Sequence, residues 1–255
     1  MTLEIHRARG HVPMRVVALM NEPIGYLDDL LHLDAFLAAA ARHDLDERTR
    51  RTIEPIEVTA WPVDFGLPLS TWSVEDPGDV DDRLLKSHKQ LVKGTPDRAR
   101  ANERRLWGWC ASAADDAAWS RRGKIEIRKK PPLAEMVRYT KDKTANVASG
   151  PLKAYDLAIP TVLAAEVTWF ALGDIDAVRR LLVEYIPAVG KKRGIGMGDV
   201  REWIVEPCGD DRSVLKADGS PARRLPHGAA PGAPGQGAIR PPYWHHTRLV
   251  PSVEP

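Results

Sequence analysis

Residues 160–207 carry four local patterns in a fixed order: an apolar run, an amphipathic segment, a glycine-rich turn and a second apolar run. The run "PTVLAAEVTWFALG" (160–173) predicts a strand region, and "DVREWIVEP" (199–207) predicts another strand. Between them Asp174 is a natural helix N-cap, and apolar residues recur at helical spacing as far as Ile186. Pro187 and Gly190 end this helix. We therefore expect strand, helix, turn and strand over this stretch.

A similar unit opens the chain. "VPMRVVALM" (12–20) predicts a buried strand, and "LHLDAFLAAAARHD" (31–44) predicts a helix with Leu33 and Leu37 on its apolar face. Residues 56–70 are expected to form a pair of short strands, interrupted by Pro62 and Gly66. Two strand–helix–strand units predict an α+β fold with a ferredoxin-like core of the RNA-recognition type, with helices on one face of an antiparallel sheet.

The segment between the two units is basic. Residues 98–143 contain thirteen Lys and Arg residues against six Asp and Glu residues, whereas the whole chain has a net charge of +2. We expect a long insertion here, with an Arg-rich helix followed by an alternating strand at "KIEIRKK" (124–130). Two interpretations stay open: a solvated charged face, or a surface for an anionic partner.

After Pro207 the sequence is rich in Pro and Gly and shows little periodicity, so we expect a loose, extended tail. The predicted organisation is the first half of the core at 1–75, the basic helical insertion at 76–143, the second half of the core with its glycine-rich loop at 144–207, and the tail at 208–255.

Several classes of protein are disfavoured by composition. Cys110 and Cys208 form no CxxC pair, which argues against a disulfide framework and a thiolate zinc site, and no stretch has the length of a membrane span. We expect a soluble, cytoplasmic protein without a metal or cofactor. No HExxH or Ser–His–Asp signature is present. A general-base role for His32 or His88 remains an alternative to an ordinary core or surface histidine.

The turn "GKKRGIGMG" (190–198) follows a helix and precedes a strand. Dinucleotide-binding and P-loop motifs need the reverse order, so that phosphate meets a helix N-terminus. Two interpretations remain. The glycines form a tight connection that needs positive φ, or their bare backbone and the adjacent cations bind the phosphates of a polynucleotide.

Three stretches together resemble one family: "LLHLDAFLAAA" (30–40), "TANVASGPLKAYDLAIP" (144–160) and "AVGKKRGIGMGDVREWIVEP" (188–207). They are similar to the RAMP-superfamily subunit of type IV CRISPR systems that occupies the Cas-five-like position. The glycine-rich loop is typical of the wider superfamily, and the other two stretches resemble the type IV subunit. The resemblance covers about residues 12–207, and the tail has no counterpart in it.

The resemblance implies a ferredoxin-like core with a protruding, mostly helical, thumb-like insertion. It also implies a non-catalytic, RNA-binding subunit that holds the 5′ handle of the CRISPR RNA (crRNA) at one end of an effector complex, near the site of target DNA entry. The partners it implies are the backbone RAMP subunit, a large-subunit-like protein, target DNA and a DinG-type helicase. Mapped onto this chain, the superfamily loop falls on Gly190, Lys191, Lys192, Arg193, Gly194, Gly196 and Gly198. The type IV segment falls on Asn146, Ser149, Gly150, Lys153 and Tyr155.

The charge pattern extends this RNA-binding hypothesis along the insertion, because a strand of RNA needs cations for its phosphates and open backbone for close approach. The insertion residues that we assign to this track are Arg128, Lys129, Lys130, Arg138, Lys141 and Lys143. Two alternatives stay open. One is a metal-independent crRNA-processing endoribonuclease of the same superfamily, and the other is an adaptor whose basic insertion docks on an acidic protein.

Overall fold

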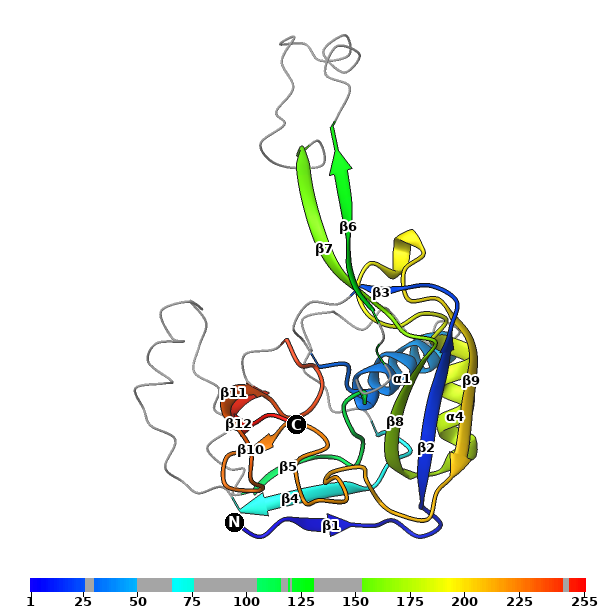
Figure 1. The fold of residues 1–255 in the computed structure, drawn as a ribbon. Coiled ribbons are helices and arrows are strands. Elements are labelled where there is room, and N and C mark those ends of the chain that lie inside the picture. Colours follow the sequence, from blue (N-terminus) through cyan, green and yellow to red (C-terminus); the bar gives the residue numbers. More distant parts are fainter. Residues whose placement is uncertain are drawn as a thin grey trace.

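The computed structural model describes residues 1–25, 30–49, 66–75, 105–115, 119, 121–130, 153–244 and 248–255. Within these residues the chain folds into four three-stranded sheets and two α-helices, which is an α+β fold (Figure 1). Neither helix of the described part is long and apolar enough to cross a membrane.

The central sheet contains β2 (Val12–Met20), β8 (Glu166–Gly173) and β9 (Val200–Pro207), in the order β8-β2-β9. Both neighbours run antiparallel to β2. Alternate residues of β2, among them Met14, Val16 and Ala18, point into the main core, as the two-residue period of a strand requires. The strands predicted at 12–20 and 199–207 are confirmed.

Helices α1 (Leu33–Thr49) and α4 (Ile175–Tyr185) cover one face of this sheet (Figure 1). Asp174 caps α4 as predicted, because its Oδ1 accepts a hydrogen bond from the Ala177 N–H at 3.0 Å. The apolar stripe of α4 packs against Trp169, Trp203 and Val205 of the sheet. Each helix therefore connects to the sheet in the strand–helix order that the sequence predicts.

The free edge of β8 is met by an extended segment at 111–115. Ala111 bridges to Ala171 and Asp115 bridges to Thr168, both in the antiparallel sense. This segment follows β5 (Arg105–Trp109), which forms the sheet β1-β4-β5 with β1 (Glu4–His6) and β4 (Thr71–Glu75). It thereby occupies the edge position next to β8 that a fourth strand of the central sheet would take.

The expectation of an Arg-rich helix around 98–120 is wrong over the described residues. Residues 105–109 form β5, and residues 121–129 form β6 (Arg121–Lys129), which pairs along its whole length with β7 (Tyr155–Leu163). In β5 the Trp107 and Trp109 rings meet edge to face at 5.4 Å, and Arg240 lies 4.3 Å over Trp107. These long-range contacts outweigh the helical propensity of the flanking Ala and Arg residues.

β6 and β7 form a two-stranded arm that projects away from the body of the molecule (Figure 1). At its base, β7 also pairs with the short strand β3 (Ile24–Gly25), through Ile24 opposite Val162 and Gly25 opposite Thr161. The projecting part of the predicted insertion is thus a β-ribbon where the structure describes it, and its second strand lies in the region assigned from the sequence to the second half of the core.

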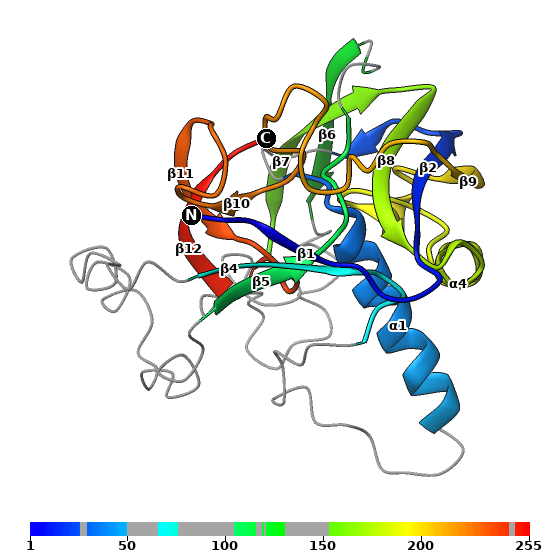
Figure 2. The ribbon, with the colours of Figure 1, turned by 90° about the horizontal axis from the view of Figure 1, so that it is seen from below.

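The tail is not loose, which corrects the expectation for 208–255. Within it β10 (Leu225–Pro226), β11 (Pro234–Ala238) and β12 (Leu249–Val253) form a sheet in the order β10-β12-β11. Figures 1 and 2 both place these strands beside β4 and β5. The tail contributes to a second buried cluster, whose members are Trp72, Val74, Cys110, Leu172, Val214, Leu225, Ile239, Val250 and Val253.

The remaining calls from the sequence concern short segments and cysteines. Of the strand pair expected at 56–70, only residues 66–70 are described, and there Leu69 forms a single bridge to Gly173. Both cysteines are free, and Cys110 is buried. Among the described residues no group of three or more His, Cys, Asp or Glu side chains has an arrangement suited to a metal ion.

Candidate nucleic-acid interface

The glycine-rich turn between α4 and β9 is held in place by its backbone. The Val189 N–H donates to the Gly198 carbonyl at 2.8 Å, which closes the turn on itself. The Lys191 N–H donates to the Gly25 carbonyl at 2.8 Å, and the Gly198 N–H donates to the Pro23 carbonyl at 2.9 Å. The turn is therefore fixed against the β3 segment at both of its ends.

Two of its glycines are explained by the fold. Gly190 and Gly198 have φ angles of 81° and 69°, in the left-handed region. A Cβ added at Gly198 would lie 1.9 Å from the Val189 carbonyl oxygen, and one added at Gly190 would lie 2.5 Å from Ile24 Cγ2. The interpretation of this turn as a tight connection is therefore correct for these two positions.

Gly194 is different, because nothing in the described structure demands a glycine there. Its φ lies outside the left-handed region, and a Cβ built on it would meet no heavy atom within 4 Å. It lies in a short 3₁₀ turn, η5 (Arg193–Ile195), whose residues are exposed. The turn thus offers bare backbone to whatever lies outside the chain.

Three consecutive cations precede this open backbone in the turn. Lys191, Lys192 and Arg193 are all exposed, and Lys192 has a φ of 63°, which turns the chain sharply just before η5. Gly196 follows at a φ of 89°, also with open space around its α-carbon. The combination of exposed cations and uncovered backbone is suited to phosphate groups, whose oxygens accept hydrogen bonds from both.

The structure brings this turn together with the arm. Gly25 bridges to Lys191 on one side and pairs with Thr161 of β7 on the other. The order of neighbours is therefore β6, β7, β3 and then the Lys191 turn, and Figure 1 shows the turn beside the base of the arm. Nine residues in each strand of the arm extend about 30 Å from this base.

The arm has two chemically different faces, because side chains alternate along each strand and directly opposed residues share a face. The charged face carries Arg122, Lys124, Glu126, Arg128 and Asp156. The other face carries large apolar side chains that are 37–47% exposed: Ile125, Tyr155, Leu157 and Leu163. Lys129 lies opposite Tyr155 at the far end of this apolar face.

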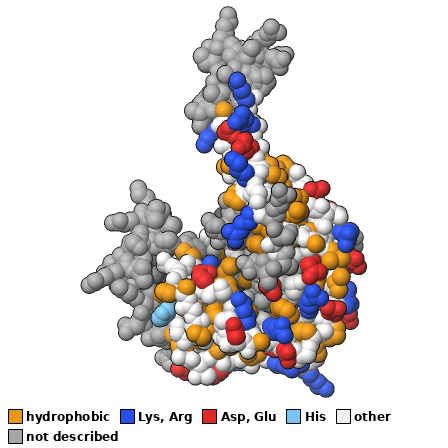
Figure 3. All heavy atoms as spheres, viewed as in Figure 1, with side chains coloured by type: hydrophobic (Ala, Val, Ile, Leu, Met, Phe, Trp, Pro, Cys, Tyr) orange, Lys and Arg blue, Asp and Glu red, His pale blue; other side chains and the backbone are white. Residues whose placement is uncertain are grey.

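Some cations of the arm are paired within the chain. Arg128 Nε lies 2.8 Å from Asp156 Oδ2, and Lys124 Nζ lies 3.2 Å from Glu126 Oε1. More than half of each of these side chains is exposed, so the pairs contribute little to stability and the cations remain accessible to phosphate. Figure 3 shows Lys and Arg side chains along the projecting arm.

The sixteen residues predicted to bind RNA divide into three groups. Six lie on the turn, where all but the buried Gly198 are exposed. Five exposed residues lie on or next to the strands of the arm: Arg128, Lys129, Lys130, Lys153 and Tyr155. The other five lie outside the described residues: Arg138, Lys141, Lys143, Asn146 and Ser149.

The histidines considered as general bases differ in what can be said of them. His32 is buried, with 2% of its surface exposed, and burial followed by the charges of Arg223 and Arg224 lowers its pKa well below the usual value. Its ring stacks on Tyr243 at 4.2 Å between centroids. A ring enclosed in this way is a core residue in this conformation of the chain. His88 lies outside the described residues.

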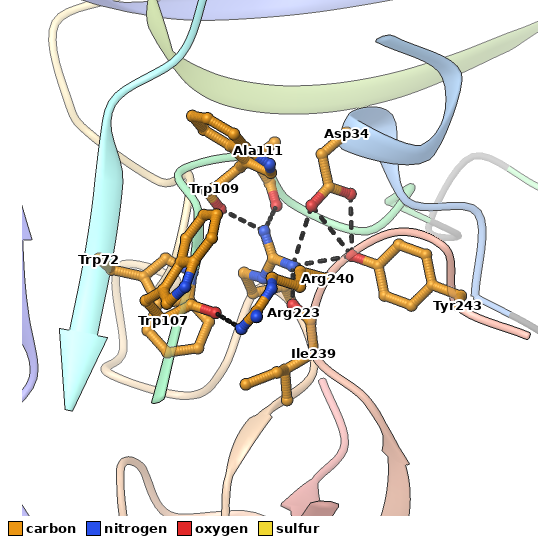
Figure 4. Close-up of polar contacts among 9 residues, drawn as sticks. All are labelled: Asp34, Trp72, Trp107, Trp109, Ala111, Arg223, Ile239, Arg240 and Tyr243. Carbon is orange, nitrogen blue, oxygen red and sulfur yellow. Dashed lines mark hydrogen bonds and ion pairs between the residues drawn. The ribbon is translucent and has the colours of Figure 1, made fainter. Parts of the chain in front are cut away.

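Sequence reasoning missed a buried ionic cluster that joins the tail to the core (Figure 4). Arg223 and Asp34 are both fully buried, and Arg223 Nη2 lies 3.1 Å from Asp34 Oδ2. The Tyr243 hydroxyl donates to Asp34 Oδ1 at 2.8 Å and accepts from Arg223 Nη2 at 2.8 Å. Arg223 also donates to the carbonyl oxygens of Trp109, of Ala111 at 2.9 Å and of Ile239 at 2.5 Å.

The environment of the cluster alters its ionisation. Burial raises the pKa of Asp34, and the Arg223 guanidinium and the Tyr243 hydroxyl act against this rise. For Arg223, burial lowers the pKa, but Tyr243 and Asp34 outweigh it, so that the pKa of the guanidinium is raised. Arg223 is therefore a permanent buried cation whose charge is balanced by Asp34. Its partners are 112 to 189 residues away in sequence or lie in the tail itself, so no local sequence pattern predicts the cluster.

A family model for the CRISPR type IV associated protein Csf3 matches residues 13–255. No curated protein matches the chain. The matched region includes the ordered tail at 208–255, for which the sequence alone suggested no counterpart.

Proposed function

The chain belongs to the Csf3 family of CRISPR type IV associated proteins, and from this premise we propose that it is the RNA-binding subunit that holds the 5′ handle of the crRNA in a type IV effector complex. Its place is the Cas-five-like position, at the end of the backbone formed by the RAMP subunit and near the site of target DNA entry. The large-subunit-like protein is its neighbour there, and a DinG-type helicase is recruited to the assembled complex.

The observation that carries the proposal is the glycine-rich turn. Gly194 has open space and needs no unusual φ, yet it directly follows three exposed cations on a turn whose two ends are fixed by backbone hydrogen bonds. A ribose-phosphate backbone that lies flat against the main chain explains both the absence of a side chain and the flanking Lys191, Lys192 and Arg193. From there the track continues onto the arm at Arg128, Lys129 and Lys130.

The fold supports the same proposal. Strand order β8-β2-β9, the two helices on one face and the bridging segment 111–115 at the edge are features that support a ferredoxin-like core as part of the proposal. The projecting β6–β7 arm takes the role of the thumb. The role we propose is non-catalytic. Of the two histidines considered as general bases, His32 is enclosed in the core, which disfavours it as the base of an endoribonuclease, and His88 lies outside the described residues.

The test is a salt titration of binding between the purified chain and a repeat-derived 5′-handle RNA. Lys191→Glu with Arg193→Glu removes two phosphate contacts, so the slope of log affinity against log salt should become shallower by about 1.4. A matched control is Arg7→Glu with Arg9→Glu, which makes the same change of charge on exposed residues beside β1, at the other end of the molecule from the arm. Equal slopes in the two double variants would contradict the proposal.

Gly194 provides a sharper version of this test. Gly194→Leu adds a side chain into open space, so the melting temperature should hold within about 2 °C while affinity for the handle falls about tenfold or more. The same RNA incubated with the wild-type chain in EDTA distinguishes the alternative, because the proposed subunit leaves it intact and a metal-independent nuclease gives a site-specific product.

A further inference from the structure

A second candidate site lies between the central sheet and the tail, and it shares no residue with the glycine-rich turn or the arm. It is a pocket of about 410 Å³, bordered by the segment 112–115, Phe170 of β8, and Arg212 and residues 216–218 of the tail. This volume falls in the range of small-molecule sites, roughly 300–1,000 Å³. The proposed function uses none of its residues.

The floor of the pocket is rigid. Three successive backbone N–H groups each donate at 2.8 Å to a different part of the chain: Ala113 to the Ala222 carbonyl, Ala114 to the Leu31 carbonyl and Asp115 to the Thr168 carbonyl. The hydroxyl of Ser112 accepts from the Phe170 N–H at 2.9 Å. Because the floor is bonded to the tail, to the start of α1 and to β8, a ligand would enter a preformed site with little ordering cost.

The walls combine aromatic and cationic groups. The Arg212 guanidinium lies over the Phe170 ring, 5.4 Å from its centroid, and Trp119 lines the same pocket. Arg212 is held only loosely, by an exposed ion pair with Asp210 at 3.7 Å. Guanidinium planes and aromatic rings are the two kinds of surface on which unstacked nucleobases lie in proteins.

The polar groups of the pocket match the other parts of a nucleotide. Lys216 is exposed at the rim, where the turn 216–220 fixes it through the Lys216 N–H and Ser220 carbonyl hydrogen bond of 2.8 Å. Together with Arg212 it supplies positive charge for a phosphate. Asp115 is an exposed residue of the lining, and a carboxylate accepts several hydrogen bonds from amino groups.

We infer that this pocket binds a single unstacked nucleotide: the base stacks on Arg212, Phe170 and Trp119, and its phosphate meets Lys216. Asp115 selects a base that carries an exocyclic amino group, because cytosine, adenine and guanine offer such a donor and uracil does not. The nucleotide belongs to a single strand of RNA that the chain binds, and a free mononucleotide has the same chemistry.

The experiment measures saturation-transfer NMR signals and affinities of CMP, AMP, GMP and UMP with the full chain, beside an RNA whose single-stranded positions are made abasic one at a time. We expect the three amino-bearing nucleotides to bind more tightly than UMP, and Phe170→Leu or Arg212→Gln to weaken binding about tenfold. Asp115→Asn should remove the discrimination against UMP and leave stacking intact. Arg224→Gln, next to the buried Arg223 and away from the pocket lining, is the matched control.

The outcomes separate the sources and the hypotheses. Loss of affinity at one abasic position, with mononucleotides too weak to detect, identifies a nucleotide within a strand. Binding of mononucleotides without any abasic effect identifies a free nucleotide. Unchanged binding of every mononucleotide and of the RNA in Phe170→Leu and in Arg212→Gln overturns the inference. Lys191→Glu with Arg193→Glu changes no residue of this pocket. A failure of the pocket hypothesis can therefore be distinguished from a failure of the proposed RNA binding by the glycine-rich turn.

Discussion

Replacing Arg223 by Met should cost the chain a large part of its stability. The guanidinium is fully buried and serves five acceptors: the Asp34 carboxylate, the Tyr243 hydroxyl and three backbone carbonyls. Met has a similar length, so packing is largely kept while the charge and all five hydrogen bonds are lost. Removing one partner of a buried ion pair costs about 3–5 kcal/mol, because the other charge remains uncompensated. The free energy of unfolding of a whole domain is only about 5–15 kcal/mol.

The assay is urea and thermal unfolding, followed by near-ultraviolet and far-ultraviolet circular dichroism. For a chain of this size, 3–5 kcal/mol corresponds to a fall in melting temperature of about 6–20 °C. The near-ultraviolet signal is informative because Arg223 lies over the Trp72 ring at 5.6 Å and donates to the Trp109 carbonyl. Both signals should change in one transition, since the cluster bonds the tail to the core.

A double-mutant cycle tests the cause. Arg223→Met leaves the Asp34 carboxylate without its cation, and Asp34→Leu removes that carboxylate. The double variant should therefore lose about 1–3 kcal/mol less stability than the sum of the losses in the two single variants. Arg224→Met is the control: its 2.8 Å pair with Glu254 is partly exposed, and its loss should cost at most about 1 kcal/mol. The reasoning fails if Arg223→Met costs no more than Arg224→Met, or if the cycle is additive.

Three further predictions concern the tail, His32 and the glycines. Deletion of residues 212–255 should leave a chain without a cooperative thermal transition, because Trp72, Val74 and Leu172 lose their buried cover; a transition close to that of the full chain would contradict this. Burial lowers the pKa of His32 in the folded chain, so below pH 6.5, the ordinary histidine pKa, the unfolded state takes up a proton that the folded state does not. Stability should therefore fall as the pH drops below about 6.5, by up to about 1.4 kcal/mol per pH unit. Since no described residue hydrogen-bonds either ring nitrogen of His32, His32→Phe should flatten this acid slope between pH 6.5 and 5 in urea unfolding curves, and an unchanged slope would show that other groups cause it. Gly198→Ala should cost about 2 kcal/mol or more in the same assay, whereas Gly194→Ala should be neutral or slightly stabilising; equal effects would refute the distinction between the two positions.

The sequence predicts the parts of this fold whose signals are local. β2 and α4 are examples: a run of β-branched residues gives the strand at 12–20, and the Asp174 cap with an apolar stripe gives the helix. Order in the tail depends instead on contacts with distant residues, such as Arg223 with Asp34 and β12 with β11. A Pro- and Gly-rich segment without periodicity looks the same in sequence whether or not such contacts exist, so the sequence does not predict the order of the tail.

The candidate site shows the same division. The exposure of the cations at 191–193 can be predicted from the sequence, because a run of charged residues in a turn is exposed whatever packs around it. That the turn lies beside the base of the arm depends on the two-residue strand β3, which is too short to be recognised from its own residues. Likewise "RLWGW" (105–109) is read as helix from its Arg- and Ala-rich surroundings, and only the pairing with β4 makes it a strand.

The buried cluster and the inferred nucleotide pocket are coupled, because both depend on the docked tail. Ala222 accepts the Ala113 N–H at the pocket floor, and the next residue along the chain is Arg223, which donates to the Ala111 carbonyl. A nucleotide that binds only the docked form should therefore stabilise it, by about 2.7 kcal/mol at a hundred times its Kd. By the same linkage, Arg223→Met should weaken nucleotide binding in the pocket. Binding of the RNA handle to the glycine-rich turn should be preserved, because the turn is hydrogen-bonded to the β3 segment and not to the tail. Parallel loss of both activities in Arg223→Met, at a temperature where the chain remains folded, would contradict the independence of the turn and the pocket.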